Sequence, residues 1–341
     1  MSRIGILTGG GDCPGLNPVI RAVVKRATMD KWEVLGFKNG WKGIIENDFI
    51  PLNDGLVSGI LPKGGTILGT SRTNPYKKPG DVDKVKQTLS KNNLHALIAI
   101  GGEDTLGAAN KLHKDGIQVV GVPKTIDNDL NSTDYTFGYD TALNIAMECI
   151  DRLHTTAESH NRVIVVEIMG RHAGWIAMEA GLAGGADVIL IPEVPVDIDK
   201  VCELIKKRHS RGKTFSIVAV AEGAKLKDHG MVADQKVDQF GHVRLGGIAV
   251  GLEKEIERRT GFETRMTILG HVQRGGTPTA YDRVLGTRFG IHAVDAATNG
   301  DFGKMVALRG TKIELIPLED ALREPKLVDP ELLETAEVFY G

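Results

Sequence analysis

Residues 96–107 read ALIAIGGEDTLG, in which an apolar run leads into two glycines and a polar segment. Short apolar runs of this kind are typical of strands buried on both faces of a parallel sheet. Seven such runs occur along the chain, at Ile4–Leu7, Ala96–Ile100, Val119–Val122, Val163–Ile168, Val188–Ile191, Ser216–Ala221 and Met266–Leu269. Helical patterns lie between them. Because parallel strands need crossover connections, the alternation predicts an α/β fold with two doubly wound, mainly parallel-sheet (Rossmann-like) domains.

Apolar residues between these runs recur at helical spacing. One predicted helix has Asp140 as its N-cap and an apolar face made of Ala142, Ile145, Ala146, Cys149, Ile150 and Leu153. A second runs through Ile248, Leu252 and Ile256. We expect one domain over 1–140 plus about 260–300, and another over 141–259 plus about 301–323. Residues 324–341 are expected to form a C-terminal tail with a loop and a short helix on the surface.

The composition excludes several classes of protein. Lys and Arg number 42 against 44 Asp and Glu, so the net charge is −2, whereas nucleic-acid coats and membrane-surface binders need a basic surplus. Aromatic residues make up only 5%, which argues against a stacking platform for bases. The three cysteines are scattered, which favours a reducing cytoplasm over a disulfide framework. No signal-peptide pattern and no apolar run near ~18 residues is present, so we expect no membrane association.

One glycine motif occurs twice. Residues 9–15 read GGGDCPG and residues 101–107 read GGEDTLG, so both fit GGxDxxG after a predicted strand. Bare glycines let a backbone approach an anion, and a helix N-terminus attracts negative charge. The motif therefore indicates either phosphate-binding loops or two tight strand–helix turns. Neither copy matches the dinucleotide fingerprint, and no Walker A loop is present.

The segment PKTIDND, residues 123–129, concentrates polar chemistry directly after a predicted strand. In an extended loop, Asp127 and Asp129 would face the same way, roughly 6–7 Å apart. One carboxylate could accept a proton while the other orients it or approaches a metal. Lys124 could neutralise a phosphate. The alternative is an Asx-rich surface turn.

Two more polar clusters follow predicted strands. Residues 169–174 read MGRHAG, and residues 270–276 read GHVQRGG. Arg171 could bind a phosphate with its guanidinium fork or lie on the surface at a helix start. His271 and Arg274 would share one side of a turn and favour anion binding, with a structural histidine as the alternative.

Four isolated charged residues carry the same ambiguity. Arg72 lies in GTSR and Glu222 in AEG, where the carboxylate could bind sugar hydroxyls or cap a loop. Arg162 and Arg265 each precede a predicted strand, a position that favours a surface role for both.

Taken together, these motifs resemble one family. The segments GGGDCPGLN, GTSR, GGEDT, PKTIDND, MGRHAG, AEG, ETR and GHVQRGG occur in the order and approximate spacing of the 6-phosphofructokinase family, and the resemblance extends to about Leu318. It implies phosphoryl transfer to the C1 hydroxyl of fructose 6-phosphate, in a cleft between a phosphoryl-donor domain, the first above, and a sugar-phosphate domain.

The resemblance also implies roles for individual residues. Asp127 would be the catalytic base, and Gly11 and Arg72 would contact the donor and the transferring group. Glu103 would be the acid associated with Mg²⁺. Catalysis would further involve Lys124, Asp104 and Arg171. The sugar phosphate would be bound by Thr125, Asp127, Arg162, Met169, Gly170, Arg171, Glu222, Arg265, His271, Val272, Gln273 and Arg274. Arg162 and Arg265 would come from a neighbouring subunit, so the resemblance implies a homodimer or homotetramer.

The phosphoryl donor depends on two positions. Asp104 replaces a glycine that, in the ATP-using pattern GGDGS, makes room for the α-phosphate of the nucleotide. A carboxylate there fills the space and repels the anion, by ~4 kcal/mol at 4 Å and an effective dielectric near 20. Together with Lys124, it makes the chain resemble the pyrophosphate-dependent branch of the family. The alternatives are an ATP-dependent enzyme of the same family and a non-catalytic sugar-phosphate sensor.

Overall fold

The computed structural model describes residues 2–227 and 246–341, and it divides into two compact units. Unit 1 comprises Met1–Ile126, Leu130–Thr141 and Arg274–Pro325. Unit 2 comprises Asp127–Asp129, Ala142–Gln273 and Lys326–Gly341. Among the described helices, none has both the length and the apolar character that crossing a membrane requires.

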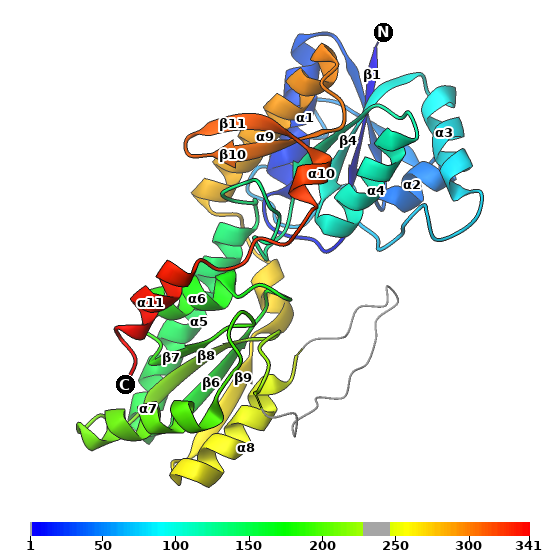
Figure 1. Ribbon diagram of the computed structural model, residues 1–341. Helices are drawn as coiled ribbons and strands as arrows, with labels where there is room; N and C mark the ends of the chain where they lie inside the picture. Colours follow the sequence, from blue (N-terminus) through cyan, green and yellow to red (C-terminus); the bar gives the residue numbers. More distant parts are fainter. Residues whose placement is uncertain (1, 228–245) are drawn as a thin grey trace. The chain divides into compact units, whose positions relative to one another are not determined.

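Unit 1 is built on a sheet whose described strands run in the order β11-β10-β5-β4-β1-β2-β3 (Figure 1). These strands are β1 (Arg3–Thr8), β2 (Glu33–Phe37), β3 (Phe49–Leu52), β4 (Leu94–Gly101), β5 (Val119–Pro123), β10 (Lys304–Arg309) and β11 (Lys312–Pro317). The pairs from β10 to β2 are parallel, whereas β3 and β11 join the two edges antiparallel. The central strands are buried on both faces, which is why they are nearly continuous apolar runs.

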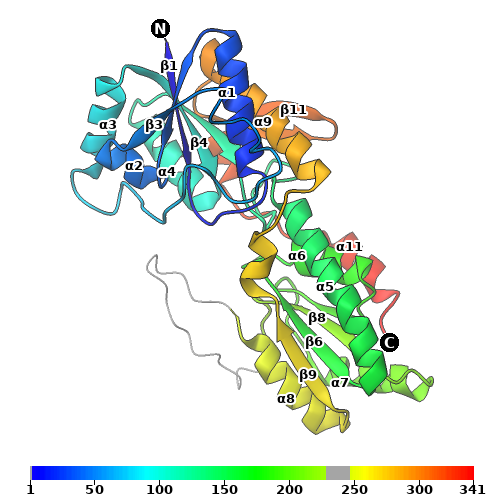
Figure 2. The same cartoon turned by 180° about the vertical axis from the view of Figure 1, so that it is seen from behind.

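Helices cover both faces of this sheet (Figures 1 and 2). One face carries α2 (Trp41–Glu46), α3 (Asp81–Lys91) and α4 (Glu103–Lys114), which share a core with the sheet. The other carries α1 (Leu16–Met29) and α9 (Ala280–Asn299). An added Cβ at Gly290 of α9 would lie 2.7 Å from the Cβ of Ala22 in α1, so a larger residue there would force these two helices apart. The short helix α10 (Leu318–Ala321) packs against α4.

Unit 2 has a parallel sheet in the order β7-β8-β6-β9 within the described residues. The strands are β6 (Val163–Ile168), β7 (Val188–Leu190), β8 (Ser216–Ala221) and β9 (Thr264–Ile268). One face is covered by α7 (Ile198–Ser210) and α8 (Ile248–Thr260), and the other by α5 (Tyr139–His160) and α6 (Trp175–Ala183) (Figure 2). The last helix, α11 (Pro330–Glu337), packs against α6.

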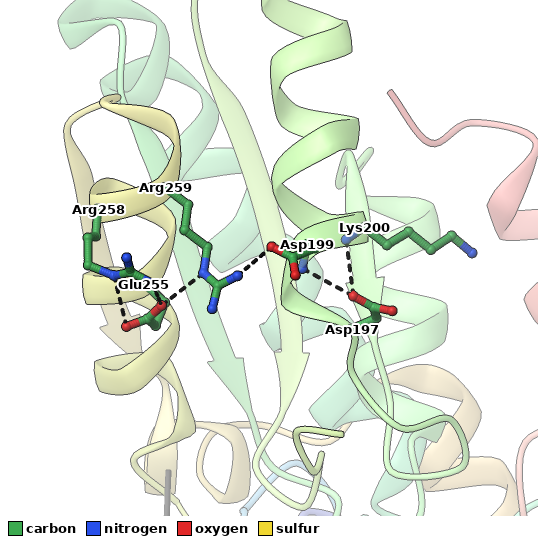
Figure 3. A network of polar contacts seen from close by, with 6 residues as sticks. All are labelled: Asp197, Asp199, Lys200, Glu255, Arg258 and Arg259. Carbon is green, nitrogen blue, oxygen red and sulfur yellow. Dashed lines mark hydrogen bonds and ion pairs between the residues drawn. The ribbon is translucent and has the colours of Figure 1, made fainter. Parts of the chain in front are cut away.

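A surface network of charges joins α7 to α8 (Figure 3). Glu255 accepts hydrogen bonds from Arg258 and Arg259, and Arg259 also binds Asp199 on α7. Asp197 caps the first turn of α7 through its side chain. Because most of these groups face solvent, the network adds little to stability compared with the apolar core beneath it.

All seven predicted strands are present, and the α/β class with doubly wound parallel sheets is confirmed. The expected domain limits differ from the structure in several places. Residues 127–129 and the end of the chain from Lys326 belong to unit 2. Residues 301–323 belong to unit 1, because β10 pairs with β5, whereas β9 belongs to unit 2, because it pairs with β6. The N-cap prediction was also wrong, since α5 begins at Tyr139 and Asp140 lies inside its first turn.

Candidate active site

The first glycine motif forms a tightly packed loop between β1 and α1. An added Cβ at Gly9 would lie 2.6 Å from Oγ1 of Thr105, and one at Gly11 would lie 2.7 Å from the guanidinium of Arg274. Gly15 has a φ of 109° and forms the N-cap of α1. A side chain at position 9 would displace Thr105, and one at position 11 would push the guanidinium of Arg274 away from the loop.

Two cationic side chains contact this loop within unit 1. Lys124 is 3% exposed, and its ammonium lies 2.6 Å from the carbonyl oxygen of Gly11. Arg274 donates to the carbonyl oxygen of Asp12 at 3.3 Å. The sequence predicted both cations separately, and the structure brings them to the same loop. Two positive charges at one loop are an arrangement that can bind an anion.

The two copies of the glycine motif differ in structure. In the second copy Gly102 is the N-cap and α4 begins at Glu103, so Gly107 lies inside the helix. In the first copy the helix begins only after the seventh residue. Both copies thus lead into a helix as predicted. The first copy forms a loop before its helix, whereas most of the second copy is already helical.

Glu103 and Asp104 are exposed in the first turn of α4. Among the described residues, no group of three or more His, Cys, Asp or Glu side chains is arranged to hold a metal ion. Mg²⁺ commonly uses only one or two carboxylates together with substrate phosphates. The oxygen donors at the start of α4 therefore fit an ion that arrives with a phosphate.

The segment that carries Arg72 runs beside the glycine loop. The hydroxyl of Thr70 donates to the carbonyl oxygen of Gly10 at 2.5 Å, and the Gly10 N–H donates to the carbonyl oxygen of Ser71 at 3.3 Å. Arg72 itself is exposed. The structure therefore places its backbone near the loop that Lys124 contacts.

The segment after β5 also belongs to unit 1 as far as Ile126. Thr125 is buried, and its carbonyl oxygen accepts the hydroxyl of Thr136 at 2.8 Å. A little further along, the N–H of Gly138 donates to Asp282 at 2.8 Å, and Thr141 donates to the same carboxylate through its N–H and its hydroxyl. Burial raises the pKa of Asp282 to about 6. This carboxylate thereby anchors the segment that holds Thr125.

Residues 127–129, the acid loop, begin unit 2. Asp127 is 4% exposed and Asn128 is 2% exposed. Asn128 has a φ of 52°, in the left-handed region, so the expected extended conformation with two aligned carboxylates was wrong. The loop is buried rather than the surface turn considered as its alternative.

Residues 169–174, the arginine loop, follow β6 and contain two residues with positive φ. Gly170 has a φ of 150° and Arg171 a φ of 54°. Their N–H groups donate to Oε1 of Glu222 at 3.3 and 3.1 Å. Burial raises the pKa of Glu222, with a further contribution from the charge of Asp127. The carboxylate of Glu222 thus binds two other predicted residues, Gly170 and Arg171. The adjacent Met169 is half-buried.

Arg162 and Arg265 share a carboxylate. Both bind Glu263, with N···O distances of 2.8 and 2.6 Å. Arg162 precedes β6 as predicted, but Arg265 lies within β9 rather than before it. These strands are neighbours, which explains how residues about a hundred positions apart meet.

The remaining predicted residues lie on a 3₁₀ helix, η1 (Gly270–Arg274). His271 and Val272 are exposed, whereas Gln273 is fully buried and donates to the carbonyl oxygen of Gly270. Because His271 is exposed, a ligand can reach it. The buried Gln273 instead holds the turn of η1 together through its bond to Gly270.

Sequence reasoning missed Glu167. This residue is 2% exposed, and its carboxylate accepts the N–H groups of Gly247 at 2.8 Å and Ala249 at 3.0 Å, at the start of α8. The available signal was a single acid in the otherwise apolar strand VIVVEI. A buried acid in such a strand needs partners, and here they are the free N–H groups of a helix start.

Comparison with known proteins identifies the family of the chain. A family model described as "Phosphofructokinase" matches residues 3–297. A relative from Amycolatopsis methanolica, named pyrophosphate--fructose 6-phosphate 1-phosphotransferase, is 60% identical over 99% of this chain and 100% of its own length. A Streptomyces coelicolor protein named ATP-dependent 6-phosphofructokinase 3 is 56% identical over 96% of each chain. The solved phosphofructokinase of Saccharomyces cerevisiae is 32% identical with a TM-score of 0.83, and the match covers 99% of this chain but only 46% of the yeast chain.

Proposed function

Because the chain belongs to the phosphofructokinase family, we propose that it transfers a phosphoryl group from pyrophosphate to the C1 hydroxyl of fructose 6-phosphate. The products are fructose 1,6-bisphosphate and phosphate. The reaction is reversible and serves glycolysis and gluconeogenesis. We also propose the cytoplasm as its compartment, because the three scattered cysteines suit a reducing environment.

The carboxylate of Asp104 is the feature that favours pyrophosphate over ATP as the donor. It stands in the exposed first turn of α4, where the resemblance to ATP-using enzymes calls for a glycine beside the α-phosphate. Repulsion between this carboxylate and a nucleotide phosphate disfavours ATP. Pyrophosphate has no group corresponding to the α-phosphate of ATP, so it does not meet Asp104. Lys124 supports the same choice, since its ammonium stabilises the charge on a departing inorganic phosphate.

Catalysis requires positioning and charge neutralisation more than covalent chemistry. Asp127 accepts the proton of the C1 hydroxyl as the new P–O bond forms. Arg171 and Arg72 stabilise charge on the phosphoryl group in transit. The bond to the leaving phosphate breaks, and Lys124 stabilises the negative charge that remains on it.

The sugar phosphate is anchored by the other predicted residues. His271 and Arg274 bind the 6-phosphate, and Thr125, Met169, Gly170 and Glu222 line the sugar. Glu222 supports this role through its hydrogen bonds to the arginine loop. In a homodimer or homotetramer, Arg162 and Arg265 would leave Glu263 to bind a phosphate in the neighbouring subunit.

Mg²⁺, when bound with the donor, would neutralise charge on its phosphates. Glu103 is the residue we propose to hold it, because its carboxylate is exposed at the start of α4 and offers the oxygen ligands that this ion prefers.

A second candidate is an ATP-dependent 6-phosphofructokinase. The observation in its favour is the 56% identity to a relative with that name, only slightly below the 60% identity to a relative named for pyrophosphate. Overall identity therefore does not separate the two donors.

The donor can be identified with a matched assay. The purified chain is given fructose 6-phosphate, equal Mg²⁺ and either pyrophosphate or ATP, and kcat/KM is measured for each donor. We expect pyrophosphate to give the higher value by about 100-fold or more, the ratio that ~3 kcal/mol of discrimination produces. A higher kcat/KM with ATP would establish the second candidate instead.

A further inference from the structure

Residues 326–328, here called the strap, form hydrogen bonds with two loops of unit 2. The N–H of Lys326 donates to the carbonyl oxygen of Asp129 at 2.8 Å, and its own carbonyl oxygen accepts the indole N–H of Trp175 at 2.8 Å. The Lys326 ammonium also lies 5.0 Å from the centre of the Trp175 ring. Trp175 is the first residue of α6, directly after the arginine loop.

A partly buried carboxylate holds the other end of the strap. Oε1 of Glu193 accepts the N–H of Gly174 at 2.9 Å and the N–H of Val328 at 3.1 Å. An added Cβ at Gly174 would lie 2.5 Å from Cβ of Ile191 and 2.8 Å from Oε2 of Glu193, so a side chain there would displace both neighbours. Val328 is 6% exposed. One acid therefore links the strap to the last residue of the arginine loop.

The two loops joined by the strap both contain left-handed residues. Asn128 has a φ of 52° and Arg171 a φ of 54°. Residues other than glycine keep this conformation only where surrounding contacts hold it. The strap supplies such a contact directly to the acid loop, through Asp129. The arginine loop is held by Glu193, which the strap also binds, and by Glu222.

We propose that the strap positions the catalytic base, with the backbone N–H of Lys326 as its principal contact. This inference rests on the proposed function, in which Asp127 takes the proton of the sugar hydroxyl. The Asp129 carbonyl that the strap binds is two residues from that carboxylate, with the left-handed Asn128 between them. Lys326 does not touch the reacting atoms, so it is a positioning residue. A phosphoryl transfer that depends on alignment is sensitive to shifts of about 1 Å.

A pair of proline variants tests this directly. Lys326→Pro removes the N–H that donates to Asp129, because proline has no backbone donor. Leu327→Pro puts the same ring one residue further on, where the half-exposed Leu327 contributes none of these bonds. We expect Lys326→Pro to lower kcat by about 10- to 100-fold and to change the KM for fructose 6-phosphate less than about twofold. Leu327→Pro should retain kcat within about threefold.

Two further variants distinguish the loss of a strap contact from a general loss of folding. Lys326→Ala keeps the backbone N–H and removes the side chain beyond Cβ, so its loss of kcat should be small beside that of Lys326→Pro. Trp175→Phe keeps an aromatic ring but removes the indole N–H together with part of the ring area, and it should lower kcat by several-fold with an unchanged KM. Unfolding temperatures are measured for all four variants, so that kcat is compared among folded proteins.

The outcomes distinguish a failure of the strap proposal from a failure of the proposed donor. Every comparison uses the donor that the unmodified chain turns over faster, so a preference for ATP would contradict the proposed donor and leave the strap comparison intact. Wild-type kcat in both Lys326→Pro and Trp175→Phe would overturn the role of the strap. So would equal losses in the two proline variants, or losses that appear in KM rather than in kcat.

Discussion

The ammonium of Lys124 lies 2.6 Å from the carbonyl oxygen of Gly11, although 113 residues separate them. This contact places a buried cation on the glycine loop between β1 and α1, where Arg274 also binds. A donor phosphate at this loop would meet the charge of Lys124 and the backbone of adjacent glycines, whereas the guanidinium of Arg274 is the group proposed for the 6-phosphate of the sugar. The arrangement suits an inorganic anion with few other features to recognise.

The first prediction concerns this cation. Lys124→Met keeps most of the apolar stem and removes the charge, so the KM for pyrophosphate should rise by about tenfold or more, as expected for a lost hydrogen bond to a charged group. The KM for fructose 6-phosphate should change little. Lys114→Met, on the exposed end of α4, is the matched control. An unchanged KM for pyrophosphate would exclude Lys124 from donor binding.

The second prediction concerns Asp104. Asp104→Gly removes both the bulk and the charge that exclude a nucleotide, so kcat/KM with ATP should rise by at least tenfold. Asp104→Asn removes the charge alone and should give a smaller rise. Parallel assays with both donors measure the change. If ATP is used no better by either variant, the carboxylate is not what excludes it.

The third prediction concerns the base. Asp127→Asn should lower kcat by roughly 10²–10⁴-fold, the usual range for loss of general-base catalysis, with KM for the sugar phosphate nearly unchanged. Asp129→Asn neutralises the other carboxylate of the acid loop and should cost much less. Steady-state kinetics at saturating donor measure both. Retained turnover in Asp127→Asn would assign the base to another residue.

The fourth prediction concerns pH and stability. The pKa of Asp282 is about 6 in the folded chain, above its ordinary value of 3.8, because the carboxyl is buried. The folded state therefore holds this proton where the unfolded state has released it. The stability contributed by this group is complete below about pH 4 and is lost as pH rises through about 6, an effect on the order of 3 kcal/mol.

Urea unfolding between pH 4 and 7 measures this effect. Asp282→Asn cannot titrate, so its unfolding free energy should fall less steeply with pH than that of the unmodified chain, whatever its absolute stability. Parallel pH profiles for the two proteins would contradict the raised pKa.

Sequence patterns predicted the central strands because burial on both faces makes them uniformly apolar. They missed β2, which contains Gly36, because a glycine weakens a strand pattern. In the fold that glycine is required, since an added Cβ would lie 2.6 Å from Leu68. They also missed β10 and β11, an antiparallel pair at the edge of the sheet. In β10 only four apolar residues lie between Lys304 and Arg309, and in β11 Glu314 interrupts the apolar residues.

The candidate site was predicted residue by residue, but its contacts were not. Each motif predicted its own charged groups, whereas the meeting of Arg274 with the glycine loop depends on pairings of distant segments. The acid loop was mispredicted for a local reason. An Asn in the left-handed region leaves no mark on an apolar pattern, so Asn128 could not be distinguished from an extended residue.

The left-handed conformation of Asn128 has a consequence for engineering. Glycine adopts that conformation without the steric cost that other residues incur, so a screen that rewards heat resistance alone would favour Asn128→Gly. The same change would widen the range of shapes open to the loop beside Asp127 and slow turnover. At this one position, a substitution chosen for rigidity of the fold would therefore act against the alignment that the reaction needs.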